Sequence, residues 1–130
     1  MKLLLININK KRGEHMVKKL IHAEALIIFV GILFIYGYLN LNWWLFFLFL
    51  LAPDLSALGY LFGNKIGAYT YNLVHTFLLP VLILFFSFIF SIHILSVIGL
   101  IWSAHIAMDR TIGYGLKYSD NPKSTHLQKL

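Results

Sequence analysis

Cysteine is absent from this 130-residue chain, and charged residues are scarce. Without thiols the protein has neither a disulfide framework nor a thiolate metal site. Charged residues make up 12% of the sequence, whereas soluble domains carry about 25%. From Ile66 to Met108 there is no Asp, Glu, Lys or Arg, over a length about twice the roughly 20 residues that one membrane span needs. The sequence therefore predicts a single-domain integral membrane protein.

The hydrophobic residues, 59% of the chain, form four apolar segments separated by short polar turns. The segments are long and do not alternate, and a lipid bilayer accepts only helices or closed barrels. Short connections favour antiparallel neighbours. We expect an all-α, four-transmembrane-helix antiparallel bundle with spans at about 20–39, 43–62, 68–90 and 93–116. Residues 1–19 would form a basic N-terminal tail and residues 117–130 a polar C-terminal tail.

Basic residues gather in the N-terminal tail, the 63–67 loop and the C-terminal tail. Cytoplasmic loops are enriched in Lys and Arg, and an even number of spans puts these three regions on one side. We therefore expect a multi-pass protein of the inner (plasma) membrane with both termini in the cytoplasm. The net charge of +6 then reflects membrane anchors, and nucleic acid is a poorer interpretation. The apolar stretch Leu3–Ile8 is too short for a signal-peptide core, and Met16 is an alternative start.

Five ionisable residues lie inside the expected spans. At a rise of about 1.5 Å per residue, all five fall in the cytoplasmic half of the bilayer, roughly 5–15 Å from its surface. Two of them are four positions apart on the last span and share a face. Ionisable side chains at this depth are costly unless partnered, and they mark functional sites. The five are Glu24, Asp54, His75, His105 and Asp109.

Proline is also scarce, and two of the 3 prolines lie near these residues. Pro53 directly precedes Asp54, and Pro80 follows His75 by five positions. Each proline removes an amide that would bond a helical carbonyl one turn earlier. Irregular backbone is tolerated at membrane depth where it lines a protein-buried or wet cavity. The prolines therefore favour a shared site over isolated polar residues.

Imidazole and carboxylate side chains are ligands for zinc, iron and manganese, and helix bundles assemble such sites in their cores. We expect a divalent metal held by Asp54, His75, His105 and Asp109. Glu24, nearest the surface, would act as the catalytic base toward water. The simpler alternative is that these side chains hydrogen-bond between helices and stabilise the bundle.

Neighbouring polar residues extend this hypothesis. Asn72 belongs to the polar stripe of the third span, and Arg110 and Lys117 follow the expected metal ligands toward the cytoplasm. Cationic side chains there suit an anionic headgroup, so these three are candidate substrate-binding residues. His126, in the C-terminal tail, is a candidate lid residue.

Several strings resemble one bacterial family of small polytopic membrane proteins, the domain-of-unknown-function 4260 family. They are "HAEAL", "LAPDLSALGYLFG", "GAYTYNLVHTFLLP", "WSAHIAMDRTIGYGLKY" and the terminal "THL". The resemblance covers residues 20–128 and implies no activity. The polar positions of the family correspond to Glu24, Asp54, Asn72, His75, His105, Asp109, Arg110 and His126, and its usual glycine after the Glu is Ala25 here. A looser similarity, in the Pro-Asp, lone His and His-x-x-x-Asp pattern, is to membrane-bound metal-dependent hydrolases.

Three hypotheses follow. The first is a membrane-embedded, metal-dependent hydrolase that acts on a lipid or another amphiphile. The second is a proton or ion relay or transport protein, since chains of Asp, Glu and His also serve pumps. The third is a non-catalytic membrane component with a structural polar core. The bundle is small, so a homo-oligomer is plausible in each case.

Overall fold

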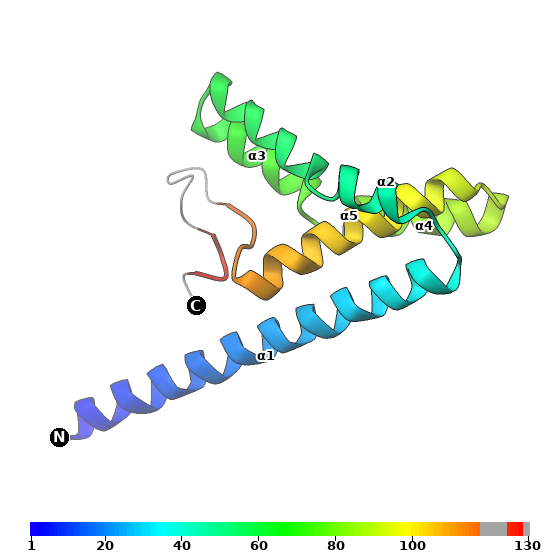
Figure 1. Ribbon diagram of the computed structural model, residues 1–130. Helices are drawn as coiled ribbons and strands as arrows, with labels where there is room; N and C mark the ends of the chain where they lie inside the picture. The colour runs from blue at the N-terminus through cyan, green and yellow to red at the C-terminus, as the bar shows by residue number, and fades with distance from the viewer. Residues whose placement is uncertain (118–124, 129–130) are drawn as a thin grey trace.

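The computed structural model describes residues 1–117 and 125–128, and helices dominate it (Figure 1). Within these residues there is no strand, only an isolated bridge between Lys117 and Thr125. The predicted all-helical class is thus confirmed. The helices are α1 (Lys2–Tyr38), α2 (Trp43–Phe49), the 3₁₀ helix η1 (Ala52–Phe62), α3 (Asn64–Val74), α4 (Leu78–Phe90) and α5 (His93–Ile112).

Helix α1 begins at Lys2, well before the expected start near residue 20. Residues 2–19 are rich in Leu, Lys and Ile, contain no proline and have a single glycine, Gly13, so little opposes a helix. At about 1.5 Å per residue the 37 residues of α1 extend about 55 Å, well beyond a hydrocarbon core of about 30 Å. The basic residues between 10 and 19 therefore lie on a helix that continues past the apolar region.

The expected second and third spans are each interrupted. The second divides into α2 and η1 and the third into α3 and α4, where one continuous helix was expected for each. Pro53 is the second residue of η1 and Pro80 the third residue of α4. Proline is tolerated in the first turn of a helix, where its missing N–H has no helical partner. Both prolines thus start a new helical segment just after a break.

Polar residues make the turns between the helices. Asn40 has a φ of 53°, and the side chain of Asn42 accepts a hydrogen bond from the Trp44 amide at 2.9 Å, capping α2. Ser91 ends α4 with a φ of 54°, and Gly63 separates η1 from α3 with a φ of 115°. Residues with positive φ thus follow α1, η1 and α4, where the chain turns back.

Helix α5 is the centre of the fold and packs against both α1 and α4, while η1 packs against α3. In Figure 1 the η1–α3 hairpin diverges from α5 toward the end of the molecule where the C-terminal segment lies. The main core joins α1, α2 and α5 and comprises Ile32, Tyr36, Phe46, Leu100, Ile101, Ala104 and Ala107.

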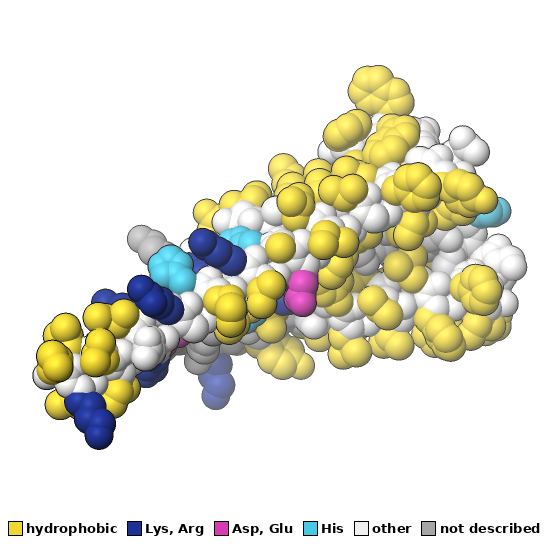
Figure 2. Space-filling view, turned by 90° about the horizontal axis from the view of Figure 1, so that it is seen from below, with side chains coloured by type: hydrophobic (Ala, Val, Ile, Leu, Met, Phe, Trp, Pro, Cys, Tyr) yellow, Lys and Arg dark blue, Asp and Glu magenta, His cyan; other side chains and the backbone are white. Residues whose placement is uncertain are grey.

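Among the described residues, three helical stretches are long and apolar enough to cross a membrane: Lys2–Tyr38, Trp43–Phe62 and Asn64–Phe90. Helix α5, the expected fourth span, is not among them. Hydrophobic side chains cover most of the face in Figure 2, whereas Lys and Arg gather toward one end of it. An exposed surface this apolar is suited to lipid.

Candidate metal centre

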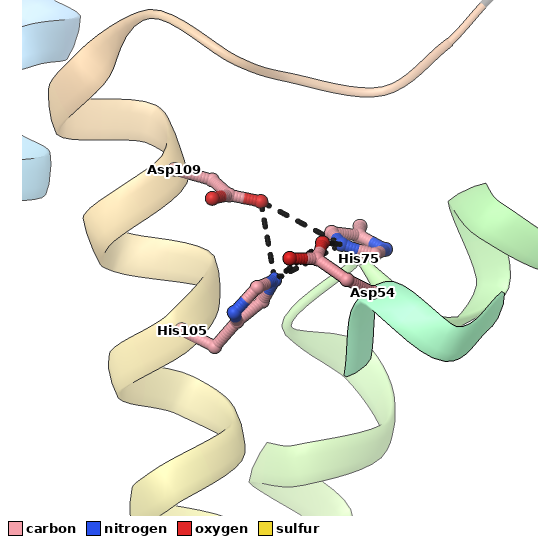
Figure 3. Close-up of side chains that lie close together, drawn as sticks. All are labelled: Asp54, His75, His105 and Asp109. Carbon is pink, nitrogen blue, oxygen red and sulfur yellow. Dashed lines mark hydrogen bonds and ion pairs between the residues drawn. The ribbon is translucent and has the colours of Figure 1, made fainter. Parts of the chain in front are cut away.

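Helix α5 supplies two of the four side chains that converge at the start of the η1–α3 hairpin (Figure 3). His105 and Asp109 are one helical turn apart, and His105 Nε2 lies 3.2 Å from Asp109 Oδ2. The His105 side chain has no exposed surface, and that of Asp109 is 15% exposed. The predicted i,i+4 face is therefore real and points into the protein.

His75 is buried at the end of α3, where the chain breaks before α4. Its ring stacks on Tyr71 with centroids 3.7 Å apart, and its Nδ1 lies 2.9 Å from the Tyr71 carbonyl oxygen. A carbonyl oxygen can only accept, so Nδ1 carries the hydrogen in this bond. The opposite nitrogen, Nε2, is thereby left with a lone pair, and it lies 3.1 Å from His105 Nε2.

The break between α2 and η1 orients His105 in the same way. Asp54 donates its amide to the Leu51 carbonyl, and Pro53 has no amide, so the Leu50 carbonyl lacks both of its helical donors. His105 Nδ1 lies 2.8 Å from that oxygen and donates to it. In an α-helix the amide of residue 53 would bond the Phe49 carbonyl, so the sequence predicts that Pro53 frees the carbonyl of Phe49. The structure shows that the one used is at Leu50, because η1 has 3₁₀ bonding.

Asp54 completes the group from the first turn of η1. Its Oδ1 lies 3.3 Å from both His75 Nε2 and His105 Nε2. Its side chain is 52% exposed, far more than the other three. Asp54 is thus the member of the group that a ligand from outside can reach.

With both histidines neutral, the four facing atoms are all hydrogen-bond acceptors: two imidazole nitrogens with lone pairs and two carboxylate oxygens. Five of their six separations lie between 3.1 and 3.5 Å, and the sixth, between the carboxylates, is within 4.8 Å. A tetrahedral metal with bonds of about 2.0–2.1 Å has ligands about 3.3–3.4 Å apart. Acceptors that face one another repel unless a cation or a proton lies between them. The group can therefore hold a metal ion, and its donor set suits zinc, iron or manganese.

The break between α3 and α4 is held by α5. Trp102 Nε1 donates to the Val74 carbonyl at 2.6 Å, and Arg110 Nη2 donates to the His75 carbonyl at 3.4 Å. The Arg110 guanidinium also lies 5.4 Å from the centre of the Phe77 ring. These carbonyls would bond amides within a continuous helix, so α5 replaces the lost helical bonds exactly where His75 is presented.

Arg110 keeps unused donor capacity beside the site. Its Nε is buried and has no hydrogen-bond partner within the described residues. His75, Asp109, Arg110 and Tyr114 line one small pocket. Lys117 Nζ lies 4.2 Å from the centre of the Tyr71 ring, which in turn stacks on His75. Both predicted cations thus lie close to the candidate ligands.

The C-terminal segment is tied to α3 by paired hydrogen bonds. The Asn72 side chain donates to the Lys117 carbonyl at 2.7 Å and accepts from the Lys117 amide at 2.6 Å. His126 accepts from the Leu116 amide through Nδ1 at 2.7 Å, and its own amide donates to the Leu116 carbonyl. Asn72, predicted to bind substrate, instead holds backbone, and His126 closes the segment onto Leu116.

Glu24 is not part of the converging group. It is exposed on α1, and the buried residue at that level is its neighbour Ala25. His22 lies on the inner side instead and donates from Nδ1 to the Thr111 carbonyl at 2.8 Å. His22 lies three residues before the buried Ala25 and so shares its face of α1, which no pattern in the sequence indicates.

Fold and site define a helical protein with membrane-type helices and a buried His/Asp group that could hold a metal ion. The chain belongs to the family described as Domain of unknown function (DUF4260), whose model matches residues 18–130. The predicted resemblance is confirmed. No curated protein and no solved structure matches the chain.

Proposed function

We propose that the protein is a membrane-embedded, metal-dependent hydrolase that acts on a lipid or another amphiphile. The observation that carries the proposal is the convergence of four side-chain atoms that are all acceptors when both histidines are neutral, with five of their six separations near those of a tetrahedral cation. In both imidazoles Nδ1 donates to a backbone carbonyl and Nε2 faces the group, as is usual for histidines that bind a metal. In a purely structural polar core a protonated histidine would have to donate to the carboxylates instead.

With His75, His105 and Asp109 as its ligands and Asp54 left off it, a divalent metal would keep an open position and would supply Lewis-acid activation of water and of a carbonyl or phosphoryl oxygen. The protein contributes the orientation of the ligands and the electrostatics around them. Two neutral imidazoles and two carboxylates carry a charge that balances a divalent cation. Asp54, the exposed carboxylate, is the group best placed to receive a proton from water at the open side. Glu24 has no contact that supports its predicted role as the base.

The cations beside the site favour an anionic substrate. The buried Nε of Arg110 has no hydrogen-bond partner within the described residues and can donate to a ligand. The Lys117 ammonium lies over the Tyr71 ring. Guanidinium and ammonium groups bind phosphate and carboxylate headgroups. In the proposed placement α5 is a fourth span, both termini are in the cytoplasm of the cell whose plasma membrane holds the protein, and these cations face the inner headgroups.

Hydrolysis of fluorogenic phospholipid and fatty-acyl ester substrates by the purified protein in nanodiscs tests the proposal. We expect turnover that a chelator abolishes and that His75→Ala lowers by roughly three orders of magnitude or more. His93→Ala, at an exposed histidine at the start of α5, is the matched control and should retain full turnover. Proton flux into proteoliposomes that Asp54→Asn abolishes, without hydrolysis, would replace the hydrolase by a relay.

A further inference from the structure

An apolar groove of about 470 Å³ lies beside the metal group, between α2, α5 and the two helix breaks. Its walls include Leu45, Phe49, Pro53, Val74, Ile98 and Trp102. Ligand pockets in proteins span about 300–1,000 Å³ and are mostly apolar. The indole N–H of Trp102, the one polar group among these six side chains, is already bonded to the Val74 carbonyl. The groove therefore offers no hydrogen bond and suits only a hydrocarbon ligand.

One end of the groove is lined by residues that lie next to the candidate metal ligands in the chain, although the ligands themselves do not line it. Pro53 directly precedes Asp54, Val74 directly precedes His75, and Trp102 lies one turn before His105. Three of the four ligand residues are thus neighbours of groove walls from three different segments of the chain. A chain in the groove would therefore bring the atoms at its polar end to the metal group.

The other end of the groove runs along α5 away from the site. Ile94, Val97, Ile98 and Ile101 line it on this helix, and from Ile94 to Trp102 the helix rises about 12 Å. Phe49, Ile94 and Ile98 on its rim are exposed, by 49%, 58% and 42%. A hydrocarbon chain could therefore enter sideways from the bilayer. The cations lie beyond the metal group, since Arg110 follows Asp109 toward the end of α5.

We propose that this groove binds one acyl chain of an anionic membrane lipid and positions the bond next to its headgroup at Asp54, His75, His105 and Asp109. The inference rests on the proposed function and names its substrate class, a lipid with at least one unbranched chain. Along the direction of α5 the apolar groove comes first, then the four candidate metal ligands, and then the cations. In such a lipid the acyl chain, the bond to be cleaved and the anionic headgroup follow one another in the same order.

Photoaffinity labelling tests the groove without any need for metal or turnover. The full chain is placed in phosphatidylglycerol nanodiscs that contain a phosphatidylglycerol with a diazirine in its acyl chain, and labelled residues are mapped by mass spectrometry. We expect labels concentrated on Phe49, Ile94 and Ile98. Equal labelling of lipid-facing residues elsewhere, such as Ile27 and Ile89, would overturn the proposal, since annular lipid alone predicts it.

A groove-filling variant provides the second arm. Ile98→Trp should lower labelling of Phe49 roughly tenfold, whereas Ile89→Trp, at an exposed isoleucine on α4, should leave it unchanged. Unchanged labelling of Phe49 in a folded Ile98→Trp protein contradicts the groove. Metal content separates the two proposals. Labelling concentrated in the groove of a protein that binds no metal would refute the hydrolase and support the groove. Metal-dependent turnover with uniform labelling would support the hydrolase and refute the groove.

Discussion

Replacing the Trp102 indole tests whether α5 holds the break that presents His75. Trp102 Nε1 donates to the Val74 carbonyl at 2.6 Å, and α3 ends at Val74 while α4 begins only at Leu78. In a continuous α-helix that carbonyl would accept from residue 78. The indole N–H is therefore its substitute donor, and Trp102→Phe leaves the carbonyl without one.

The magnitude follows from two effects. Side-chain hydrogen bonds inside membrane proteins contribute about 0.6 kcal/mol on average and at most about 1.7 kcal/mol. A buried carbonyl left unpaired costs about 1–3 kcal/mol. The first range is the net contribution of the hydrogen bond, and the second is the cost of leaving its acceptor unpaired. Because the two ranges overlap, we expect Trp102→Phe to lower the free energy of unfolding by about 1–2 kcal/mol.

Equilibrium unfolding in mixed micelles by titration with sodium dodecyl sulfate measures this difference. Trp44→Phe is the matched control, because Trp44 is 84% exposed, and its effect should stay within about 0.5 kcal/mol. Replacing Trp102 with benzothienylalanine, which keeps the shape and lacks the N–H, separates the hydrogen bond from the packing. Stability equal to wild type with benzothienylalanine would refute the role of the Val74 carbonyl.

Two further predictions concern the C-terminal segment. Asn72→Leu removes both hydrogen bonds to the Lys117 backbone, about 1–3 kcal/mol in total, and should speed amide hydrogen exchange of Lys117 by roughly tenfold or more. Burial, and then the Arg110 charge, lowers the pKa of His126, so the segment should be fully stable above the ordinary histidine pKa of about 6.5 and lose stability as pH falls below it. The protection factor of the Leu116 amide, which donates to His126, should then fall on acidification, where the protection factor is the intrinsic exchange rate at that pH divided by the observed rate.

Each of these has a matched control. Asn64→Leu, at an exposed asparagine at the start of α3, should leave exchange at Lys117 unchanged. His126→Asn removes the titrating group, so the protection factor of the Leu116 amide should lose its dependence on pH, whereas His15→Asn on exposed α1 should preserve it. A pH dependence that survives His126→Asn would assign the effect to another group.

The sequence predicted that four ionisable side chains converge, because such side chains are costly in an apolar chain unless they have partners. Asp54, His75, His105 and Asp109 come from three segments of the chain and do converge. Depth says nothing, however, about the angle around a helix. Glu24 has the right depth, but the buried position on α1 is Ala25, about 100° further around.

The helix breaks could be anticipated only in part. Pro53 and Pro80 indicate irregular backbone, but a proline in a span is compatible with a kinked, continuous helix. The breaks are complete here because donors from α5, distant in sequence, take the freed carbonyls: His105 for Leu50 and Trp102 for Val74. Pairings of that range leave no local pattern in the sequence.

Metal analysis of the purified protein tests the central claim most directly. After purification in detergent and exposure to zinc, iron or manganese, inductively coupled plasma mass spectrometry should find about one tightly bound ion per chain. His75→Ala and His105→Ala should each remove it, and His93→Ala should retain it. A folded wild-type protein that binds no such ion, or histidine variants that bind it as tightly as wild type, would contradict the assignment of Asp54, His75, His105 and Asp109 as a metal centre.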